Sequence, residues 1–180
     1  MTATNTGTLD ILGQIISNQM NISIDRIFAQ NQTQDLPKDE GLFVVIGYMA
    51  RTPYANKTKY DIVNNQYTEK QSLNMAEDIL ISLVSRNNDA RDRAYEVSMA
   101  LKSTYSQYLQ EKNHLHISTI HEILDSSFLE ASARLNRYDI RCRVIRGYYK
   151  QHSVSYYDKF YFEAWVKENN DIKKESFNIE

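Results

Sequence analysis

One stretch, Ser85–Asn113, constrains the fold of this chain more than any other. Its apolar residues recur every three or four positions, which places them along one stripe of a 3.6-residue helix. Asn87 or Asn88 can cap the first turn, and Lys112 suits the negative end of the helix dipole. The stretch therefore predicts one long helix with one buried face. The residues of that face are Ala90, Ala94, Val97, Leu101, Tyr105 and Tyr108.

A shorter amphipathic helix is predicted near the N-terminus. From Thr8 to Met20 the apolar residues again fall on one side of a helix, despite the interior Gly13. Strand-like segments separate and follow the two helices, so we expect a sheet with the long helix packed on one face. The fold class predicted from the sequence is α+β, with a small, mostly antiparallel sheet.

The strands before the long helix differ in how clearly the sequence marks them. Leu42–Ala50 is a nearly continuous apolar run, which favours a central strand. Ser23–Ala29 alternates apolar and polar residues and suggests a first strand. Leu73–Arg86 fits a strand or a helix, and the polar break that follows it favours a strand from about Ala76.

After the long helix, a strand is predicted to open at Leu115, and Asp125–Ala133 is expected to be a loop or a short helical turn. Arg137–Tyr149 alternates with period two, the pattern of a half-buried strand. Ser153–Val166 alternates as well, and the polar Gln151–Ser153 is expected to turn the chain between these two antiparallel strands.

Two segments lie outside the pattern of the core. Arg51–Tyr67 is polar and predicts an extended excursion, with a hairpin turn near Asn64. Lys167–Glu180 predicts a mobile tail. We therefore expect a single domain over residues 1–166, with the excursion as an arm ordered by neighbouring subunits or other partners. The arm's candidate interface anchors are Tyr54, Tyr60 and Tyr67.

Composition limits the classes of function. The 180 residues include 21 basic and 23 acidic side chains, a formal net charge of -2, which argues against a dedicated nucleic-acid binder. The single cysteine, Cys142, excludes an intrachain disulfide and fits a reducing compartment. Without a long apolar run or a signal-peptide pattern, we expect a soluble, non-secreted protein.

Motifs for catalysis are sparse. There is no Gly-rich phosphate loop, no G-x-S-x-G elbow and no CxxC pair. His114, His116 and His121, with Glu122 beside them, could form a metal site, or they are surface histidines near a helix end. Cys142 lies on the apolar side of its strand and is expected to be a buried small hydrophobe. No cofactor is predicted.

A row of arginines runs along the polar side of the strand Arg137–Tyr149. It consists of Arg137, Arg141 and Arg143. Two interpretations remain open, an ordinary solvated strand face and an electropositive interface or pore lining. The row is therefore the second candidate for an interface or lumen surface, beside the tyrosines of the arm.

Particular residues also resemble a known family, the neck terminator or tail terminator proteins of tailed phages. In that family a strand ends in Ser-Arg, as at Ser85 and Arg86, and an Ala-Arg-Asp-Arg helix start follows, as at Ala90–Arg93. A Glu-Val-x-x-Ala-Leu-Lys-Ser run corresponds to Glu96–Ser103, and Leu-Asn-Arg-Tyr corresponds to Leu135–Tyr138. The resemblance covers roughly residues 42–157.

The resemblance implies a structural virion protein rather than an enzyme, located in the phage neck or tail and assembled in the host cytoplasm. Such proteins form a ring at the head-tail joint, commonly a homohexamer, which ends the tail tube and docks it to the connector. The implied partners are further copies of the chain, the tail tube protein, the sheath where the tail has one, and a head-completion or connector protein. Genomic DNA passes through the lumen, and no membrane is involved. The alternatives are a small metal-dependent enzyme using the histidines and a monomeric binding module.

Overall fold

The chain divides into two compact units, each described here by itself. The first combines Met1–Asn56 with Ser72–Tyr148, and the second combines Lys57–Gln71 with Tyr149–Glu180. The computed structural model describes residues 7–30, 37–63, 66–130, 133–154, 160–168 and 171–179.

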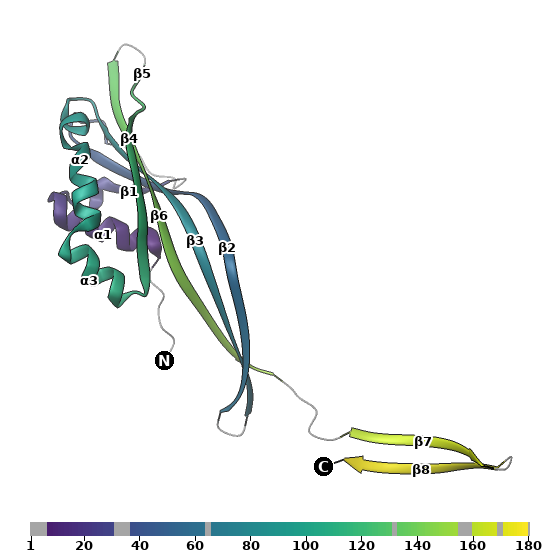
Figure 1. Cartoon of the computed structure of the whole chain (residues 1–180). Coiled ribbons are helices and arrows are strands. Elements are labelled where there is room, and N and C mark those ends of the chain that lie inside the picture. Colours follow the sequence, from purple (N-terminus) through teal and green to yellow (C-terminus); the bar gives the residue numbers. More distant parts are fainter. Residues whose placement is uncertain are drawn as a thin grey trace. The chain divides into compact units, whose positions relative to one another are not determined.

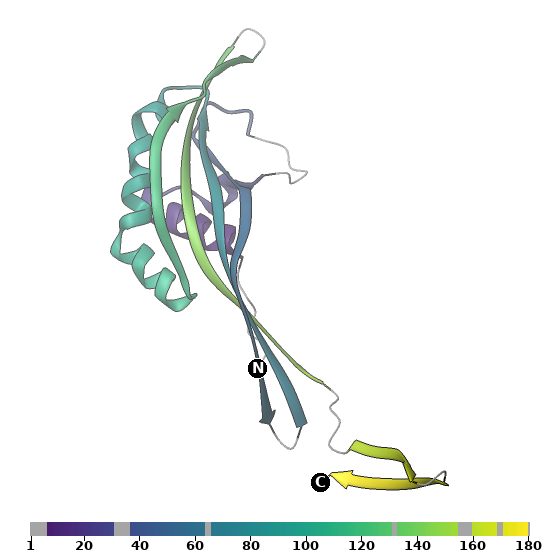
Figure 2. The same cartoon turned by 45° about the vertical axis from the view of Figure 1, so that its right-hand side comes forward.

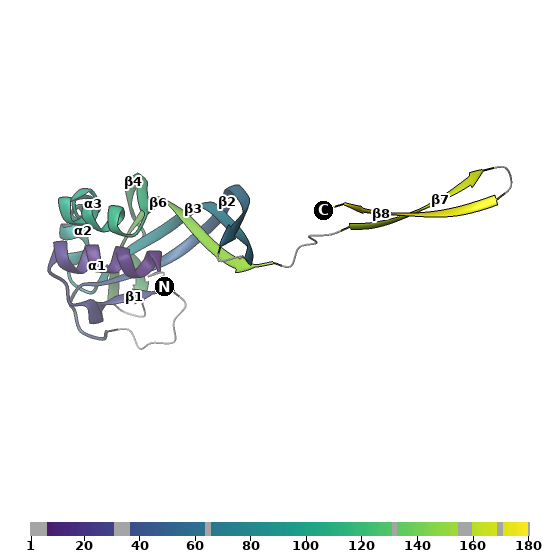
Figure 3. The same cartoon turned by 90° about the horizontal axis from the view of Figure 1, so that it is seen from below.

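In the first unit, the helices gather on one face of the main sheet (Figure 1, Figure 2). Seen from below, α1 lies on the same side of the sheet as α2 and α3 (Figure 3). The helices are α1 (Thr8–Met20), α2 (Asp89–Lys102) and α3 (Thr104–Lys112). A short 3₁₀ turn, η1 (Ile24–Arg26), follows α1. The α+β class predicted from the sequence is confirmed.

Helix α1 confirms the amphipathic helix predicted near the N-terminus. It begins where the Gly7 N–H donates to the Asp10 carboxylate at 3.1 Å. It ends at Asn21, whose φ of 52° lies in the left-handed region that commonly closes helices. Its inner face is fully buried, and burying each such aliphatic side chain stabilises the fold by about 1.5–3 kcal/mol. The residues of this face are Ile11, Leu12, Ile15 and Ile16.

The prediction of one long helix was wrong, because the helix breaks at Ser103. The backbone of Ser103 is extended, with φ −66° and ψ 160°, and its hydroxyl accepts a hydrogen bond from the Ser106 N–H at 3.1 Å. The Ser106 hydroxyl in turn donates to the carbonyl of Leu101 at 2.7 Å. These bonds satisfy backbone groups that a break would otherwise leave unpaired, so the chain can start a second helix.

The break also changes which residues face the core. Ala90, Ala94, Val97 and Leu101 in α2 are buried as predicted. Beyond the break, Tyr108 is 56% exposed, and Leu109 is buried at 6%.

The main sheet has the order β1-β2-β3-β6-β4, with β5 paired to β6. Strand β1 runs parallel to β2, whereas β4 and β5 are antiparallel to β6, so the sheet is mixed and mostly antiparallel. The strands are β1 (Ile27–Ala29), β2 (Phe43–Val63), β3 (Gln66–Ser85), β4 (Leu115–Asp125), β5 (Phe128–Glu130) and β6 (Ala133–Ser153).

The hydrophobic core lies between the helices and the inner face of this sheet. Side chains that alternate along β2, β3 and β6 point into it, as period two requires. Together with α1 and α2 they form one continuous cluster. The sheet contributes Val44, Ile46, Ile79, Ile81, Leu83, Ile140, Cys142 and Val144.

Three local predictions need correction. The segment Asp125–Ala133 contains strand β5 instead of only a loop or helical turn. The chain does not turn at Gln151–Ser153, because β6 continues through these residues. The predicted strand Ser23–Ala29 is divided between the turn η1 in its first half and the strand β1, Ile27–Ala29, in its second half.

The hairpin predicted near Asn64 is confirmed, since β2 ends at Val63, β3 begins at Gln66 and the two strands are neighbours in the sheet. Residues 64–65 lie outside the described residues.

The second unit also holds the antiparallel hairpin of β7 (Phe160–Glu168) and β8 (Asp171–Ile179). Strand β7 covers the last part of the predicted strand Ser153–Val166, of which residues 155–159 are not described. Strand β8 lies where a tail without regular structure was expected, and the mobility of that tail stays a prediction.

Among the described helices, none combines the length and the apolar character that crossing a membrane requires.

Candidate interface surfaces

The first candidate surface is the arm, defined as Arg51–Tyr67. Every residue of β2 from Met49 to Ile62 is exposed, although neighbouring residues of a strand point to opposite faces. A strand that is exposed on both faces contributes little to a core. The exposed β2 residues of the arm are therefore accessible to solvent and add little to the core of the first unit.

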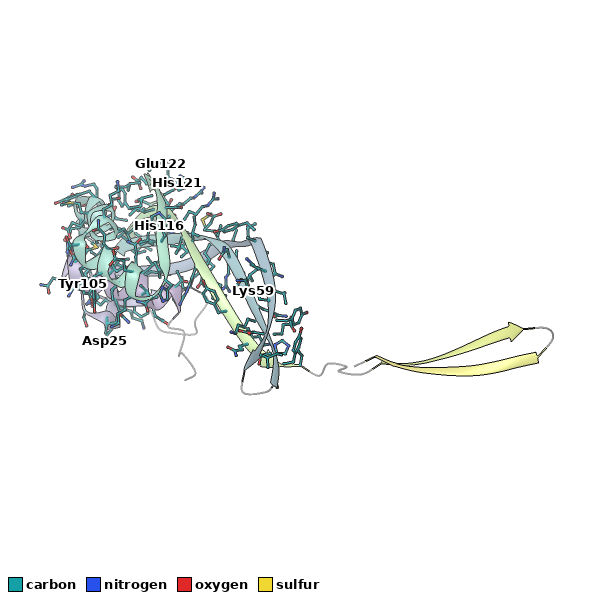
Figure 4. All side chains as sticks on the ribbon, turned by 60° about the horizontal axis from the view of Figure 1, so that its bottom comes forward. Asp25, Lys59, Tyr105, His116, His121 and Glu122 are labelled. Atoms are coloured by element: carbon teal, nitrogen blue, oxygen red, sulfur yellow. The ribbon has the colours of Figure 1, made fainter. Side chains whose placement is uncertain are left out.

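Two of the predicted tyrosine anchors contact one another. The rings of Tyr60 and Tyr67 are stacked, with centroids 5.8 Å apart and planes 13° from parallel. Tyr60 is 57% exposed and Tyr54 is 55% exposed. The arm also carries charge, including Lys59 on β2 (Figure 4) and Asp61, which forms an ion pair at 2.9 Å with Lys70 on β3, outside the arm. Aromatic side chains are enriched at protein-binding surfaces, whereas lysine and aspartate are more typical of their polar rim.

A buried polar network, which the sequence analysis missed, lies where the exposed part of β2 begins. The Glu77 carboxylate is 0% exposed and accepts hydrogen bonds from Arg51 Nε at 3.0 Å, Tyr148 OH at 2.7 Å and Thr8 Oγ1 at 2.6 Å. Arg146, 3% exposed, donates to Thr8 Oγ1 at 3.1 Å. The network therefore ties α1, β2, β3 and β6 together at one place.

Aromatic rings complete this network. The Arg51 guanidinium lies 4.8 Å from the ring centroid of Tyr48 and 5.9 Å from that of Tyr148, distances that allow cation–π attraction. Burial and, after it, the negative charge of Glu77 raise the pKa of Tyr48 above its ordinary value. Tyr48 therefore stays neutral at physiological pH.

A sequence signal for this network existed. Glu77 has the same parity as the buried β3 residues Ile79 and Ile81, and Arg146 has the same parity as the buried β6 residue Val144. A charged residue at a core-facing position of a strand needs a partner of opposite charge or hydrogen bonds. The alternation therefore indicated one buried charged residue on β3 and one on β6, but it could not show which residues would be their hydrogen-bond partners.

The arginine row lies on the outer face of the sheet, which faces away from the helices, and two of its members are paired. Arg143 forms a two-pronged ion pair with Asp78, with Nε–Oδ1 at 2.7 Å and Nη2–Oδ2 at 3.1 Å. Arg137 Nε lies 2.9 Å from Asp139 Oδ1. Arg141, between them, is exposed. These carboxylates reduce the positive potential of the row, which leaves Arg141 as its most accessible charge.

Hydrogen bonds hold the pKa values of Asp78 and Asp139 below their usual range, but only Asp139 does so against substantial burial. Hydrogen bonds from Arg143 lower the pKa of Asp78. Burial alone would raise the pKa of Asp139, but hydrogen bonds from Arg137 and Ser82 outweigh burial and hold that pKa below its usual value. Both groups are therefore ionised at neutral pH.

An apolar groove of about 220 Å³ opens on the same outer face, beside Arg137. We call it the outer groove. Because Ile81 and Leu83 point toward the helices, their neighbours on β3 line this groove instead. Phe128 on β5 is 47% exposed at its margin. The apolar residues that line the outer groove are Phe43, Val45, Leu80, Val84, Phe128 and Leu135.

The histidines do not form a cluster. Within the described ranges, no group of three His, Cys, Asp or Glu side chains could hold a metal ion. His116 and His121 are exposed on the edge strand β4 (Figure 4), and His114 precedes that strand with a φ of 52°. Strand β4 has irregular register between Ile117 and Ile123, so simple alternation does not place these histidines. Of the two interpretations left open for these residues, their exposed and separate positions favour surface histidines over a metal site.

Cys142 is buried as predicted, at 1% exposure. Burial raises the pKa of its thiol to about 12. At neutral pH it is a protonated core residue, which is unsuited to nucleophilic chemistry.

Comparison with known proteins assigns the chain to a family. A family model described as phage neck terminator protein matches residues 8–158, a span that includes all of the first unit's helices and strands and the whole arm. No curated protein matches the chain. Since the matched span covers most of the 180 residues, the chain belongs to the phage neck terminator protein family, which makes it a structural protein of the phage neck.

Proposed function

We propose that copies of this chain form a closed ring at the head-tail joint of a tailed phage, end the tail tube and dock it to the connector. The ring is a homohexamer in this proposal, and it is a structural component without enzymatic activity. The observation that carries the proposal is the family match together with an arm whose β2 residues are exposed on both faces.

A ring requires each copy to present two different surfaces, because a head-to-tail contact joins one patch to another. The arm with its tyrosines and the outer face with its arginine row and groove supply such surfaces. One ring face meets the tail tube protein and, in a contractile tail, the sheath. The other meets a head-completion or connector protein.

DNA passes through the lumen without being read in sequence. The formal charge of -2 suits this role, because a strongly basic lumen would bind phosphates and slow the exit of the genome. Arg141 remains the candidate for a limited contact with DNA or with a neighbouring subunit. The protein assembles in the host cytoplasm and resides in the virion.

The purified full-length chain can be tested by mass measurement and negative-stain imaging, alone and with isolated tail tubes. We expect a single multi-subunit mass, ring images, and rings seated on one end of the tubes. Antibody labelling of intact particles should mark the neck. Labelling elsewhere on the particle, or a monomer that leaves tube ends bare, would refute the proposal.

A further inference from the structure

The second unit carries a three-stranded ribbon whose two faces differ in chemistry. Strands β2, β3 and β6 are neighbours in the sheet, and the second unit takes residues 57–63, 66–71 and 149–153 from them. We call these residues the ribbon. Its β2 side chains are exposed from Lys57 to Ile62, so both faces of this strand are open to solvent.

Contacts between the strands show which residues of the ribbon share a face. The rings of Tyr60 and Tyr67 stack, so the even-numbered residues of β2 lie on the same face as the odd-numbered residues of β3. The His152 imidazole lies 3.0 Å from the Glu69 carboxylate, which adds the even-numbered residues of β6 to this face. We call it the aromatic face. It also carries Ile62, which is 62% exposed.

The opposite face of the ribbon is basic. The ion pair between Lys70 and Asp61, at 2.9 Å, places the odd-numbered residues of β2 on the same face as the even-numbered residues of β3. Lys57 and Lys59 therefore lie on this face as well, and both are exposed. We call it the basic face. Its three lysines meet the single carboxylate of Asp61, which leaves the face with an excess of positive charge.

The charges of the aromatic face are balanced instead. Lys150 on β6 has the parity of this face, and the Glu69 carboxylate offsets its charge. The odd-numbered residues that β6 adds to the basic face, Tyr149, Gln151 and Ser153, carry no charge at neutral pH. The excess of lysine is therefore confined to one face of the ribbon.

The chemistry of the basic face favours one kind of partner. Lysine is depleted at interfaces between proteins, whereas lysine side chains neutralise the phosphates of DNA. The lysine ammonium is a point charge on a flexible stem, so it attracts phosphate oxygens without reading the bases. An exposed face with three lysines and one carboxylate therefore complements a phosphodiester backbone better than a protein surface.

We propose that the basic face of the ribbon contacts the phosphate backbone of the DNA that passes through the ring. This inference rests on the proposed function, and it names the surface of each copy that meets the DNA. Phosphates are equivalent along a duplex, so these contacts let the DNA slide. A few lysines per copy guide the duplex without the hold that a strongly basic lumen would exert.

DNA binding by the full-length chain tests this contact. The probe is a fluorescently labelled DNA duplex of random sequence, titrated at several concentrations of NaCl. In the variant Lys57→Gln, Lys59→Gln, the slope of log affinity against log salt concentration should become shallower by about 1 per lysine, or about 2 in all. Two duplexes of unrelated sequence should bind equally, because phosphate contacts carry no sequence information.

Two matched controls separate the basic face from the overall charge and from the rest of the arm. Lys102→Gln, Lys112→Gln removes the same charge from exposed positions of α2 and α3. Ile62→Ser changes the aromatic face of the same strand. Both controls should keep the affinity and the salt slope of the natural chain.

Three outcomes would overturn the inference. Equal losses in Lys57→Gln, Lys59→Gln and in the lysine control would show that DNA responds only to the overall charge. No binding by the natural chain at low salt, or an unchanged slope in the ribbon variant, would show that the basic face does not meet DNA. Unchanged DNA binding together with lost attachment to isolated tail tubes would assign the basic face to a protein partner.

Negative-stain images of the same samples keep this test separate from the proposed function. We expect the ribbon variant to form normal rings, since its lysines contact DNA and not a neighbouring copy. A natural chain that binds DNA through these lysines but forms no rings would refute the ring and leave the DNA contact standing.

Discussion

Arg51 and Glu77 join the exposed part of β2 to the core of the first unit. Arg51 Nε lies 3.0 Å from Glu77 Oε1, and the Glu77 side chain is 0% exposed while that of Arg51 is 45% exposed. The pair therefore spans the boundary between the core and the arm.

Replacement of Glu77 tests this pair. Glu77→Gln leaves Arg51 without its carboxylate partner, and loss of a buried partner typically costs about 3–5 kcal/mol. Because water can solvate part of Arg51, we expect a loss of about 2–3 kcal/mol in the free energy of unfolding, measured in urea. Asp78→Asn, which breaks the exposed pair with Arg143, should cost about 1 kcal/mol or less. Equal losses for the two variants would contradict the role of the network.

Val97→Asp tests the buried face of α2. Val97 is 0% exposed, so the variant places a carboxylate in the core at a cost of several kcal/mol, on the order of the whole stability of a domain. We expect an insoluble or unfolded protein. Tyr95→Asp on the same helix, where Tyr95 is 57% exposed, should stay folded. A Val97→Asp protein with an unshifted melting temperature would show that this face is not buried.

Asp139 should give stability a measurable dependence on pH. Its folded-state pKa lies below the unfolded value of about 3.9. Ionised Asp139 therefore stabilises the fold above that pH, and this contribution is lost as the pH falls through the folded-state pKa. The melting temperature of Asp139→Asn should fall below that of the natural chain near neutral pH, and the difference should vanish in acid. A constant difference at every pH would contradict this assignment, and Asp25→Asn, at an exposed position, is the control.

Arg141→Glu tests the accessible charge of the outer face. Reversal of this charge should weaken ring assembly or reduce infectivity, since arginine pairs with carboxylates or phosphates of a neighbour. Arg91→Glu, an exposed substitution on the opposite, helical side, is the matched control. If assembly and infectivity are both unchanged in Arg141→Glu, the arginine row is ordinary solvated surface.

Replacement of Thr52–Gln66 by a short Gly-Ser linker tests the arm. The described β2 residues of this segment are exposed, so the first unit should keep its helical circular dichroism and cooperative melting. Ring formation or joining to tail tubes should weaken, as measured by mass and by negative stain. Collapse of the fold would assign the segment to the core. Normal assembly would show that the arm does not bind a partner.

Much of this fold follows from local patterns in the sequence. Helix α1, the buried stripe of α2 and the alternation of β6 each arise from neighbours along the chain, and each was predicted. The break at Ser103 was not, because Ser is compatible with a helix interior and also caps a new one. In the structure Ser103 caps a new helix, and Leu109 rather than Tyr108 is buried beyond it.

For the candidate surfaces too, the sequence predicted which residues share a face of a strand but not which residues they contact. Period two placed Arg137, Arg141 and Arg143 on one side of a strand, but their carboxylate partners include Asp78 on a different strand. The sequence also showed charged Glu77 and Arg146 at core-facing positions, without indicating that Thr8 links them.

By itself, the sequence determined the fold class, the amphipathic helices, the hairpin of the arm and the family resemblance, because these depend on spacing and residue type along one segment. Only the tertiary structure decided the strand order, the buried network around Glu77, the ion pairs of the outer face and the outer groove. Each of these brings together residues that are far apart in the chain. Such contacts form only when separate strands and helices meet, and a one-dimensional pattern does not encode which of them become neighbours.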